Sequence, residues 1–122
     1  MNIVFFGTPQ FSTPFLNALH EDAEFSVLAV VSQPDKPAGR GQEMRPTATK
    51  QFALENGIEI YQPKSLKSVE AQEKLKSFNA DAYIVVAYGK IIPQVVLDLP
   101  SLGCINVHPS LLPKYRGPSP MQ

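Results

Sequence analysis

The chain has 122 residues, and 43% of them are hydrophobic, which is enough for one folded domain with its own core and excludes a disordered chain. Its 11 basic and 11 acidic residues cancel, so the net charge favours no class of partner, and only a local cluster of charges can. Cys104 is the sole cysteine, which excludes an internal disulfide. Since the N-terminal apolar run is too short for a signal peptide or a membrane span, we expect a cytoplasmic protein without a membrane segment.

The first third of the chain alternates a strand pattern with a helix pattern. Residues 3–6 form a continuous apolar run, which predicts a strand buried on both faces, and a Gly-Thr-Pro turn ends it at residues 7–9. Apolar residues then recur at helical spacing over residues 11–19, and residues 25–31 predict a second strand. Residues 33–46, with prolines and glycines at their centre, predict a long loop.

The alternation continues through the middle of the chain. Residues 47–56 predict a helix, and Gly57 is placed to cap its C-terminal end. Residues 58–61 predict a short third strand. Ser68 is placed to cap a helix that carries Val69, Leu75 and Phe78.

Two further strands complete the pattern. Residues 82–87 predict a fourth strand, Pro93 predicts the first position of a short helix, and residues 103–108 predict a fifth strand. Strands that alternate with helices predict an open, mostly parallel, Rossmann-like α/β sheet with helices on both faces. The chain stops at Gln122, where another helix pattern begins, so we expect the sheet to be truncated before completion.

The fifth predicted strand carries an unusual pair of polar residues at its tip. Asn106 and His108 are two residues apart, so both side chains leave by the same face, while Ile105 and Val107 point the other way toward a core. Ligands bind at the carboxyl ends of strands in sheets of this kind. An amide donor beside an imidazole suits acyl transfer to or from an amine, because the pair can stabilise an oxyanion and move a proton.

Other chemistries fit the sequence less well. The opening turn lacks the later glycines of a dinucleotide-binding fingerprint, and Phe11 stands where the backbone must approach the pyrophosphate. Ser110 lies two residues after His108, but no acid is placed to complete a triad, and two histidines with one cysteine predict no metal site. The alternative to catalysis is that Asn106 and His108 are structural residues at a strand end.

Four segments together resemble the folate-dependent formyltransferases. The first is residues 106–117, Asn-Val-His-Pro-Ser-Leu-Leu-Pro-Lys-Tyr-Arg-Gly, a motif shared across that superfamily. The others are residues 6–9, Phe-Gly-Thr-Pro, residues 33–41, Gln-Pro-Asp-Lys-Pro-Ala-Gly-Arg-Gly, and residues 85–93, Val-Val-Ala-Tyr-Gly-Lys-Ile-Ile-Pro. The segment at residues 33–41 is the most specific of these three, and it resembles the branch that formylates methionyl-tRNA.

The resemblance implies a donor, an acceptor and a set of site residues. The donor is N10-formyltetrahydrofolate, with no metal, and Asn106 and His108 are the implied catalytic residues. The acceptor is the amino group of initiator methionyl-tRNA, in translation initiation. The implied folate-binding residues are Tyr88, Gly89, Ile91, Ile92, Ser110, Leu111, Leu112 and Pro113.

Residues 33–46 resemble the insertion by which that branch enters the acceptor stem of the tRNA. Lys36, Arg40 and Arg45 are the implied tRNA contacts, and phosphate contacts of this kind make binding depend on salt. Without the resemblance, a solvated loop is the simpler interpretation. We expect a monomer.

The chain departs from the family pattern at its end. The family has a third catalytic residue, an Asp well beyond the Asn-x-His motif, and a C-terminal domain that helps to bind tRNA. We therefore interpret residues 1–122 as the N-terminal catalytic, folate-binding domain of a formyltransferase, incomplete at its C-terminal end, and expect little or no activity from it alone. Two alternatives stay open: formylation of an amino-sugar nucleotide, and a non-catalytic folate-binding module.

Overall fold

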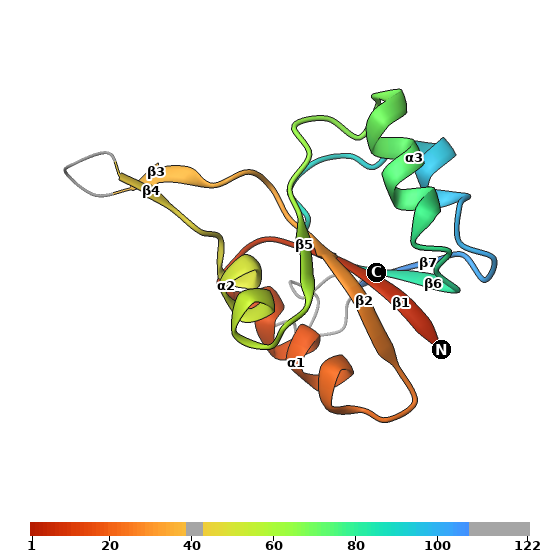
Figure 1. Cartoon of the computed structure of the whole chain (residues 1–122), viewed down its shortest axis with the longest axis horizontal. Coiled ribbons are helices and arrows are strands. Elements are labelled where there is room, and N and C mark those ends of the chain that lie inside the picture. The colour runs from red at the N-terminus through yellow and green to blue at the C-terminus, as the bar shows by residue number, and fades with distance from the viewer. Residues whose placement is uncertain (39–42, 108–122) are drawn as a thin grey trace, which may run out of the picture.

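The computed structural model describes residues 1–38 and 43–107. Its centre is a five-stranded sheet in the order β5-β2-β1-β6-β7, and every neighbouring pair of strands in it is parallel. The strands are β1 (Asn2–Gly7), β2 (Ser26–Val31), β5 (Glu59–Tyr61), β6 (Ala82–Val86) and β7 (Cys104–Val107) (Figure 1). This confirms the predicted open, parallel α/β sheet.

Helices cover both faces of the sheet, as predicted. A short 3-10 turn (Gln10–Ser12) leads into α1 (Thr13–Glu21), which packs with α2 (Ala48–Glu55) on one face through Leu16 and Ala53. On the other face, α3 (Val69–Ser77) and α4 (Gln94–Leu97) contribute Leu75 and Val96 to a second core. Because these helices lie on opposite sides of the sheet, each face of the sheet has its own apolar layer.

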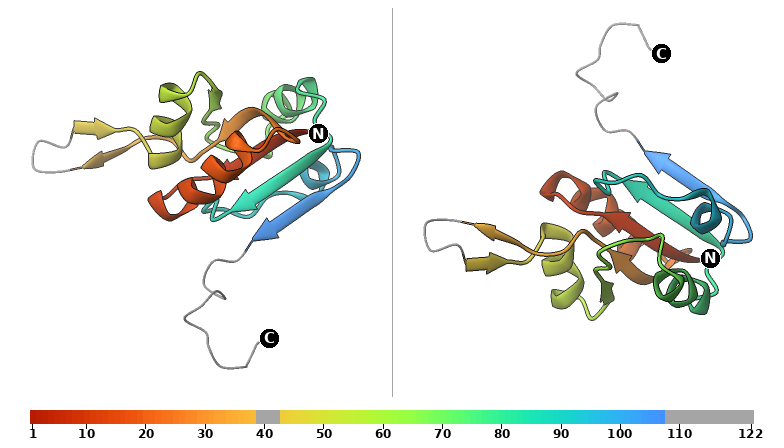
Figure 2. Two further views of the ribbon diagram at one scale, coloured as in Figure 1. Left: turned by 90° about the horizontal axis from the view of Figure 1, so that it is seen from below. Right: turned by 90° about the horizontal axis from the view of Figure 1, so that it is seen from above.

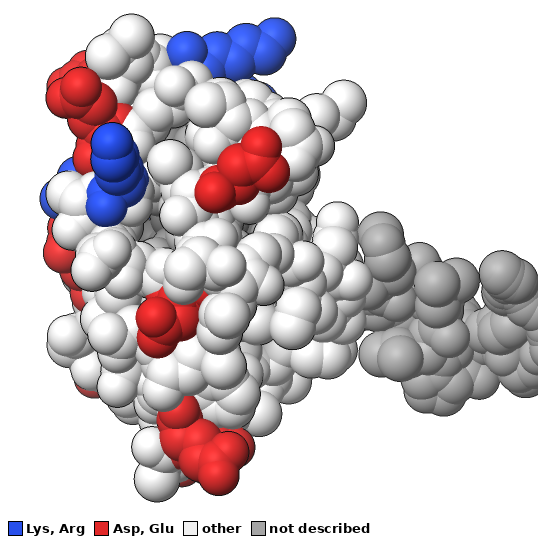
Figure 3. Space-filling model, turned by 90° about the vertical axis from the view of Figure 1, so that its right-hand side faces the viewer, with Lys and Arg blue, Asp and Glu red and all other residues white. Residues whose placement is uncertain are grey.

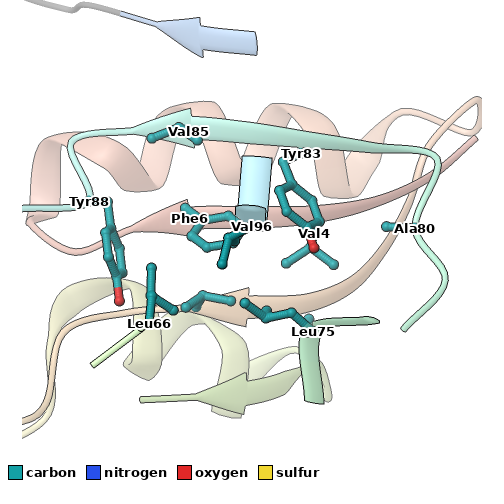
Figure 4. Packing of buried hydrophobic residues seen from close by; sticks show 11 residues of the cluster. Val4, Phe6, Leu66, Leu75, Ala80, Tyr83, Val85, Tyr88 and Val96 are labelled. Atoms are coloured by element: carbon teal, nitrogen blue, oxygen red, sulfur yellow. The ribbon is translucent and has the colours of Figure 1, made fainter. Parts of the chain in front are cut away.

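The core on the α3 and α4 side is organised around Phe6. The Phe6 side chain is fully buried, its ring centroid lies 4.9 Å from that of Tyr83, and the Tyr88 ring meets it edge-on at 5.6 Å. Figure 4 shows Leu66, Leu75 and Val96 packed around these rings. Because β1 is buried on both faces, its continuous apolar run at residues 3–6 has the burial that the sequence predicts.

The predicted helix caps at Ser68 and Gly57 are confirmed. The Ser68 hydroxyl accepts a hydrogen bond from the Ala71 N–H, and Gly57 follows α2 with a φ of 69°. Pro93, in contrast, is the N-cap residue of α4 and not its first residue, because its ψ of 148° is extended. Val69 is the first residue of α3 and is 72% exposed, whereas Leu75 of the same helix is buried.

The predicted loop at residues 33–46 contains regular structure that the sequence analysis missed. Strands β3 (Lys36–Ala38) and β4 (Glu43–Arg45) pair antiparallel in a separate two-stranded ribbon. We call these two strands the arm, and Figures 1 and 2 show it projecting away from the rest of the molecule. Proline and glycine hid the pairing, since they are rare in strands except at edges, and both strands of a lone ribbon are edges.

Strand β7 lies at the edge of the sheet, and this corrects one sequence expectation. Ile105 was predicted to face a core, but 58% of it is exposed, whereas Val107 packs against the α1 and α2 side. The helices of that face cross over the inner strands, so only part of the outermost strand is covered. Ile105 lies in the predicted strand, but it is not buried because this strand is at the edge of the sheet.

Candidate ligand-binding site

The strand order places a topological switch point between β1 and β6. From β1 the chain moves to β2 and then β5 on one side, and from β5 it crosses to β6 and then β7 on the other side. Loops that leave the carboxyl ends of β1 and β6 therefore diverge to opposite faces. A crevice opens between such loops, and ligands bind there in open α/β sheets.

The loop after β6 has an unusual backbone. Ala87 has a φ of 57°, in the left-handed region, and Gly89 has a φ of 103°. A left-handed residue with a side chain costs of order 1 kcal/mol, and such residues collect at binding sites. The Ala87 carbonyl accepts a hydrogen bond from the Thr8 N–H at 3.2 Å, which fixes this loop to the turn after β1.

A cavity of about 550 Å³ occupies the switch point; we call it the inner cavity. It is formed by the turns after β1, β2 and β6, with the lining residues Thr8, Pro9, Gln33, Pro34, Asp35, Lys36, Ala87, Tyr88, Gly89 and Lys90. Gln33 is 7% exposed, and its Nε2 is a buried donor with no hydrogen-bond partner among the described residues. A buried amide without a partner is rare, and it makes this wall suited to a ligand that carries a carbonyl or phosphate oxygen.

A second cavity of about 670 Å³, the outer cavity, lies at the carboxyl ends of β6 and β7. Most of its lining is apolar, and the polar exceptions are Asn106 and Lys90; the lining residues are Phe11, Val85, Ala87, Tyr88, Lys90, Ile91, Ile92, Leu97, Cys104, Asn106 and Val107. The segment from Ala87 to Lys90 borders both cavities. A volume of this size suits a cofactor-sized aromatic ligand held by few polar groups.

Burial keeps the Tyr88 phenol and the Cys104 thiol neutral. Burial raises the pKa of Tyr88 to about 12, and the nearby Gln33 side chain acts in the opposite direction, to lower this pKa. The Gln33 Nε2 nevertheless lies outside hydrogen-bonding geometry with the Tyr88 hydroxyl. Burial raises the pKa of the Cys104 thiol as well. Neither group is therefore an anion near neutral pH, and the outer cavity has no negative charge of its own at its lining residues.

The structure brings some of the predicted site residues together. Asn106, Tyr88, Ile91 and Ile92 line the outer cavity, although Ile91 is 93% exposed and lies at the rim, while Gly89 lines the inner cavity. Lys36 and Arg45 lie on the arm. The other predicted site residues lie outside the described residues: Arg40, His108, Ser110, Leu111, Leu112 and Pro113.

The structure also adds lining residues that the sequence analysis did not assign to a site. Thr8, Gln33 and Asp35 line the inner cavity, and each follows the carboxyl end of β1 or β2. Ligands bind beyond the carboxyl ends of the strands of such a sheet in general, and not only beyond the fifth. The positions of Thr8, Gln33 and Asp35 soon after the first two predicted strands are therefore the sequence signal for this cavity.

Two further observations concern metal ions and membranes. Within residues 1–38 and 43–107, no group of three or more His, Cys, Asp or Glu side chains is placed to hold a metal ion. No helix in this part of the chain is both long and apolar enough to cross a membrane.

Comparison with known families decides the relationship that the motifs indicated. The profile described as formyl transferase matches residues 1–122. The chain belongs to the formyl transferase family. The resemblance drawn from the sequence motifs is therefore confirmed for the family, while the narrower resemblance to enzymes of methionyl-tRNA stays a prediction.

Solved structures share the fold at low sequence identity. Phosphoribosylglycinamide formyltransferase from Bacillus halodurans matches 96% of this chain with 16% identity and a TM-score of 0.65. The corresponding enzyme from Streptococcus pneumoniae matches 95% with 22% identity and a TM-score of 0.61. Glycinamide ribonucleotide transformylase 1 from Geobacillus kaustophilus matches 95% with 22% identity and a TM-score of 0.62. The formyl transferase chain described here spans about 60% of their length (60%, 61% and 62%).

Proposed function

We propose that the protein transfers a formyl group from N10-formyltetrahydrofolate to an amine, and that residues 1–122 are the N-terminal part of its catalytic, folate-binding domain. Membership of the formyl transferase family supports the reaction class. The observation that carries the proposal is the place of Asn106: it lies on β7, next to the carboxyl end of the strand, and lines the outer cavity. A donor at the mouth of a largely apolar cavity suits a reaction in which negative charge develops on one oxygen.

The proposed chemistry assigns separate roles to the two polar residues of the motif. The acceptor nitrogen attacks the formyl carbon, and the Asn106 side-chain N–H donates to the oxyanion of the tetrahedral intermediate. His108 takes the proton that the nitrogen loses. The bond between the formyl carbon and N10 then breaks, N10 is protonated, and tetrahydrofolate leaves.

The outer cavity is the proposed folate site. Ile92, Leu97 and Val85 supply apolar walls for a flat pterin, and the loop with Tyr88 borders the same cavity. Gly89 of this loop and the exposed Ile91 at the rim also contact the folate in the proposal. In the proposal, Ser110, Leu111, Leu112 and Pro113 complete this site.

For the acceptor, we favour methionyl-tRNA because of the charges on the arm. Lys36 and Arg45 are directly opposite each other in the β3–β4 register, both are exposed, and within the described residues neither forms an ion pair. Like charges opposite each other in a ribbon are destabilising by up to about 1 kcal/mol, and a phosphate backbone along the arm would relieve this. Arg40 belongs to the same proposed contact.

Among the described residues, the end of the molecule away from the arm carries no basic patch. Figure 3 shows this end, where acidic and basic side chains of these residues are scattered. The described part of this face therefore offers no competing place for a phosphate backbone.

A second acceptor is favoured by a different observation. The three solved structures that share the fold are named as enzymes of phosphoribosylglycinamide or glycinamide ribonucleotide. The inner cavity, at about 550 Å³ and with Gln33 and Lys36 in its wall, has the size and the donors for a small phosphorylated amine.

Direct competition between acceptors tests the proposal. N10-formyltetrahydrofolate labelled on the formyl carbon is given to the complete product of the gene together with methionyl-tRNA, glycinamide ribonucleotide and an amino-sugar nucleotide. Label on the methionine amino group is the expected result, and label mainly on another acceptor replaces the tRNA assignment. If tetrahydrofolate binds but no acceptor is labelled, the protein is a folate-binding module and the enzyme proposal fails.

A further inference from the structure

The arm reaches out from the domain without packing that fixes its direction. Its described side chains Lys36, Pro37, Glu43, Met44 and Arg45 are all exposed. Apolar burial, the usual means of fixing one element against another, is therefore absent along these residues. The direction of the arm must depend on the residues where its two strands leave the domain.

One carboxylate joins three segments at that point. Asp35 directly precedes β3, and its Oδ2 lies 2.8 Å from the Nζ of Lys50, in the first turn of α2. The Asp35 Oδ1 accepts a hydrogen bond of 2.6 Å from the Nε2 of Gln62, just after β5. The Asp35 and Lys50 side chains are each 23% exposed, so the ion pair is partly shielded from water, and these donors hold the pKa of Asp35 below its usual value.

A second polar contact holds the other strand. The hydroxyls of Ser32 and Thr47 lie 2.6 Å apart, and Thr47 also caps α2 by accepting a hydrogen bond from the Lys50 N–H. Gln62 donates to the Gln33 carbonyl at 3.1 Å. Asp35–Lys50 and Ser32–Thr47 each join residues 15 apart in the sequence, on either side of the arm, and we call the five residues Ser32, Asp35, Thr47, Lys50 and Gln62 the base cluster.

The base cluster is continuous with the inner cavity. Asp35 and Lys36 line that cavity, beside Thr8 and Gly89. The residue that anchors the arm is thus also part of the wall where a ligand would lie. Asp35 therefore connects the base of the arm with the wall of the inner cavity.

We propose that Asp35 is a positioning residue: its contacts with Lys50 and Gln62 hold the arm at a fixed angle to the inner cavity, so that a methionyl-tRNA bound along the arm brings its amino group to Asn106 in the adjoining outer cavity. The RNA partner rests on the function proposed above, whereas the anchoring of the arm does not. Lys50 is a partner in this anchoring and not a free cation for phosphate, since its Nζ is committed to Asp35.

The direction in which methionyl-tRNA affinity changes in Asp35→Asn distinguishes a positioning role of Asp35 from a purely electrostatic effect. Asp35→Asn removes a negative charge beside Lys36 and releases Lys50. If charge alone matters, methionyl-tRNA binds more tightly to the variant, because phosphate affinity rises with local positive charge. If Asp35 positions the arm, the affinity falls about tenfold, while affinity for tetrahydrofolate stays within about twofold, since neither Asp35 nor Lys50 lines the outer cavity.

The matched control is the other ion pair of the described residues. Glu59 and Lys74 also lie 2.8 Å apart, but on β5 and α3, away from the arm, so Glu59→Gln removes an ion pair and changes the net charge by the same amount. Its effect on tRNA affinity should be less than twofold. Lys50→Met provides a second test from the other side of the pair, and the double variant Asp35→Asn/Lys50→Met should be no weaker than either single variant.

A distance measurement tests the anchoring without any RNA. Spin labels at Met44→Cys on the arm and Glu73→Cys on α3 report the arm direction in the complete gene product, with Cys104 and every other native cysteine of that product replaced by Ser. A single narrow distance distribution that broadens with Asp35→Asn, and not with Glu59→Gln, supports the proposal. A distribution that keeps its width in Asp35→Asn and Lys50→Met overturns it.

The two measurements also separate this inference from the proposed function. Broadening together with unchanged or tighter tRNA binding overturns the positioning role. If the native protein shows no tRNA binding at all, the tRNA acceptor is wrong and so is RNA delivery by the arm, and the spin-label widths alone then decide whether Asp35 anchors the arm.

Discussion

The Thr8 hydroxyl donates a hydrogen bond of 2.7 Å to the carbonyl oxygen of Tyr88, a residue 80 positions away in the chain. The same hydroxyl oxygen accepts a hydrogen bond from the Gln33 N–H at 3.2 Å. One threonine therefore joins the turns that follow β1, β2 and β6. These three turns form the inner cavity, so the Thr8 hydroxyl helps to hold the cavity walls together.

Thr8→Val should weaken both the fold and the site. The valine keeps the shape of the side chain but leaves the Tyr88 carbonyl and the Gln33 N–H without this partner, which costs about 1–3 kcal/mol. Chemical denaturation measures this loss, and Thr8→Ser, which keeps the hydroxyl, is the control. If Thr8→Val is as stable as Thr8→Ser, the hydroxyl does not hold the turns together.

The stability of the domain should fall in alkaline solution. Burial raises the pKa of Tyr83 and of Tyr88 to about 12, from an ordinary value of 10.0. Above pH 10 the unfolded chain loses these phenol protons before the folded chain does, so the unfolded state binds fewer protons and is favoured as the pH rises. Each tyrosine reduces the free energy of unfolding by up to about 1.4 kcal/mol per pH unit between pH 10 and pH 12.

Tyr83→Phe tests the assignment, because it removes one phenol from the core without touching either cavity. Urea unfolding at pH 8, 10 and 11 should show a shallower decrease in the variant than in the native chain. Equal slopes would mean that the Tyr83 phenol is not protected from ionisation.

The sole cysteine provides a probe of the proposed folate site. Cys104 lines the outer cavity, and burial raises the pKa of its thiol, so iodoacetamide should modify it at pH 8 more slowly than it modifies the unfolded chain. Saturating tetrahydrofolate should slow the reaction at least several-fold further, because the ligand covers the thiol. Mass spectrometry follows the modification, and a rate that tetrahydrofolate leaves unchanged places the folate elsewhere.

The arm should contribute to RNA affinity through its charges. Replacing Lys36 and Arg45 by Gln should weaken methionyl-tRNA binding and reduce the slope of log K against log salt by about 1 for each cation that contacts a phosphate. Lys76→Gln on α3, also exposed, is the control for a change in charge alone. A salt slope that is the same in both variants would remove the arm from the interface.

The sheet could be predicted from the sequence because its signals are local. The apolar run at residues 3–6 and the Ser68 cap depend on near neighbours, and both are confirmed. The exposure of Ile105 depends on β7 lying at the sheet edge, and the paired strands of the arm depend on partners across a turn. Neither the strand order nor cross-strand pairing can be read from the spacing of one segment.

The residues of the candidate site likewise divide into those that local sequence signals predict and those that depend on contacts between distant segments. Asn106 was predicted at the tip of its strand and lies there, since alternation along a strand is a local rule. Thr8 and Gln33 were missed because their importance comes from meeting the Tyr88 loop across the sheet. Asp35 was not singled out, because its contact with Gln62, 27 positions away, carries no sequence signal.

Formyl transfer by an Asn106→Ala variant tests most directly whether Asn106 stabilises the oxyanion. With labelled N10-formyltetrahydrofolate, methionyl-tRNA and the complete product of the gene, we expect kcat to fall about 100-fold or more, the cost of losing one oxyanion donor, with little change in the binding of the formyl donor. Ile105→Ala, on the neighbouring and exposed position of β7, should transfer at the native rate. Native transfer by Asn106→Ala, or no transfer by the native protein to any amine, would contradict the proposed role of Asn106.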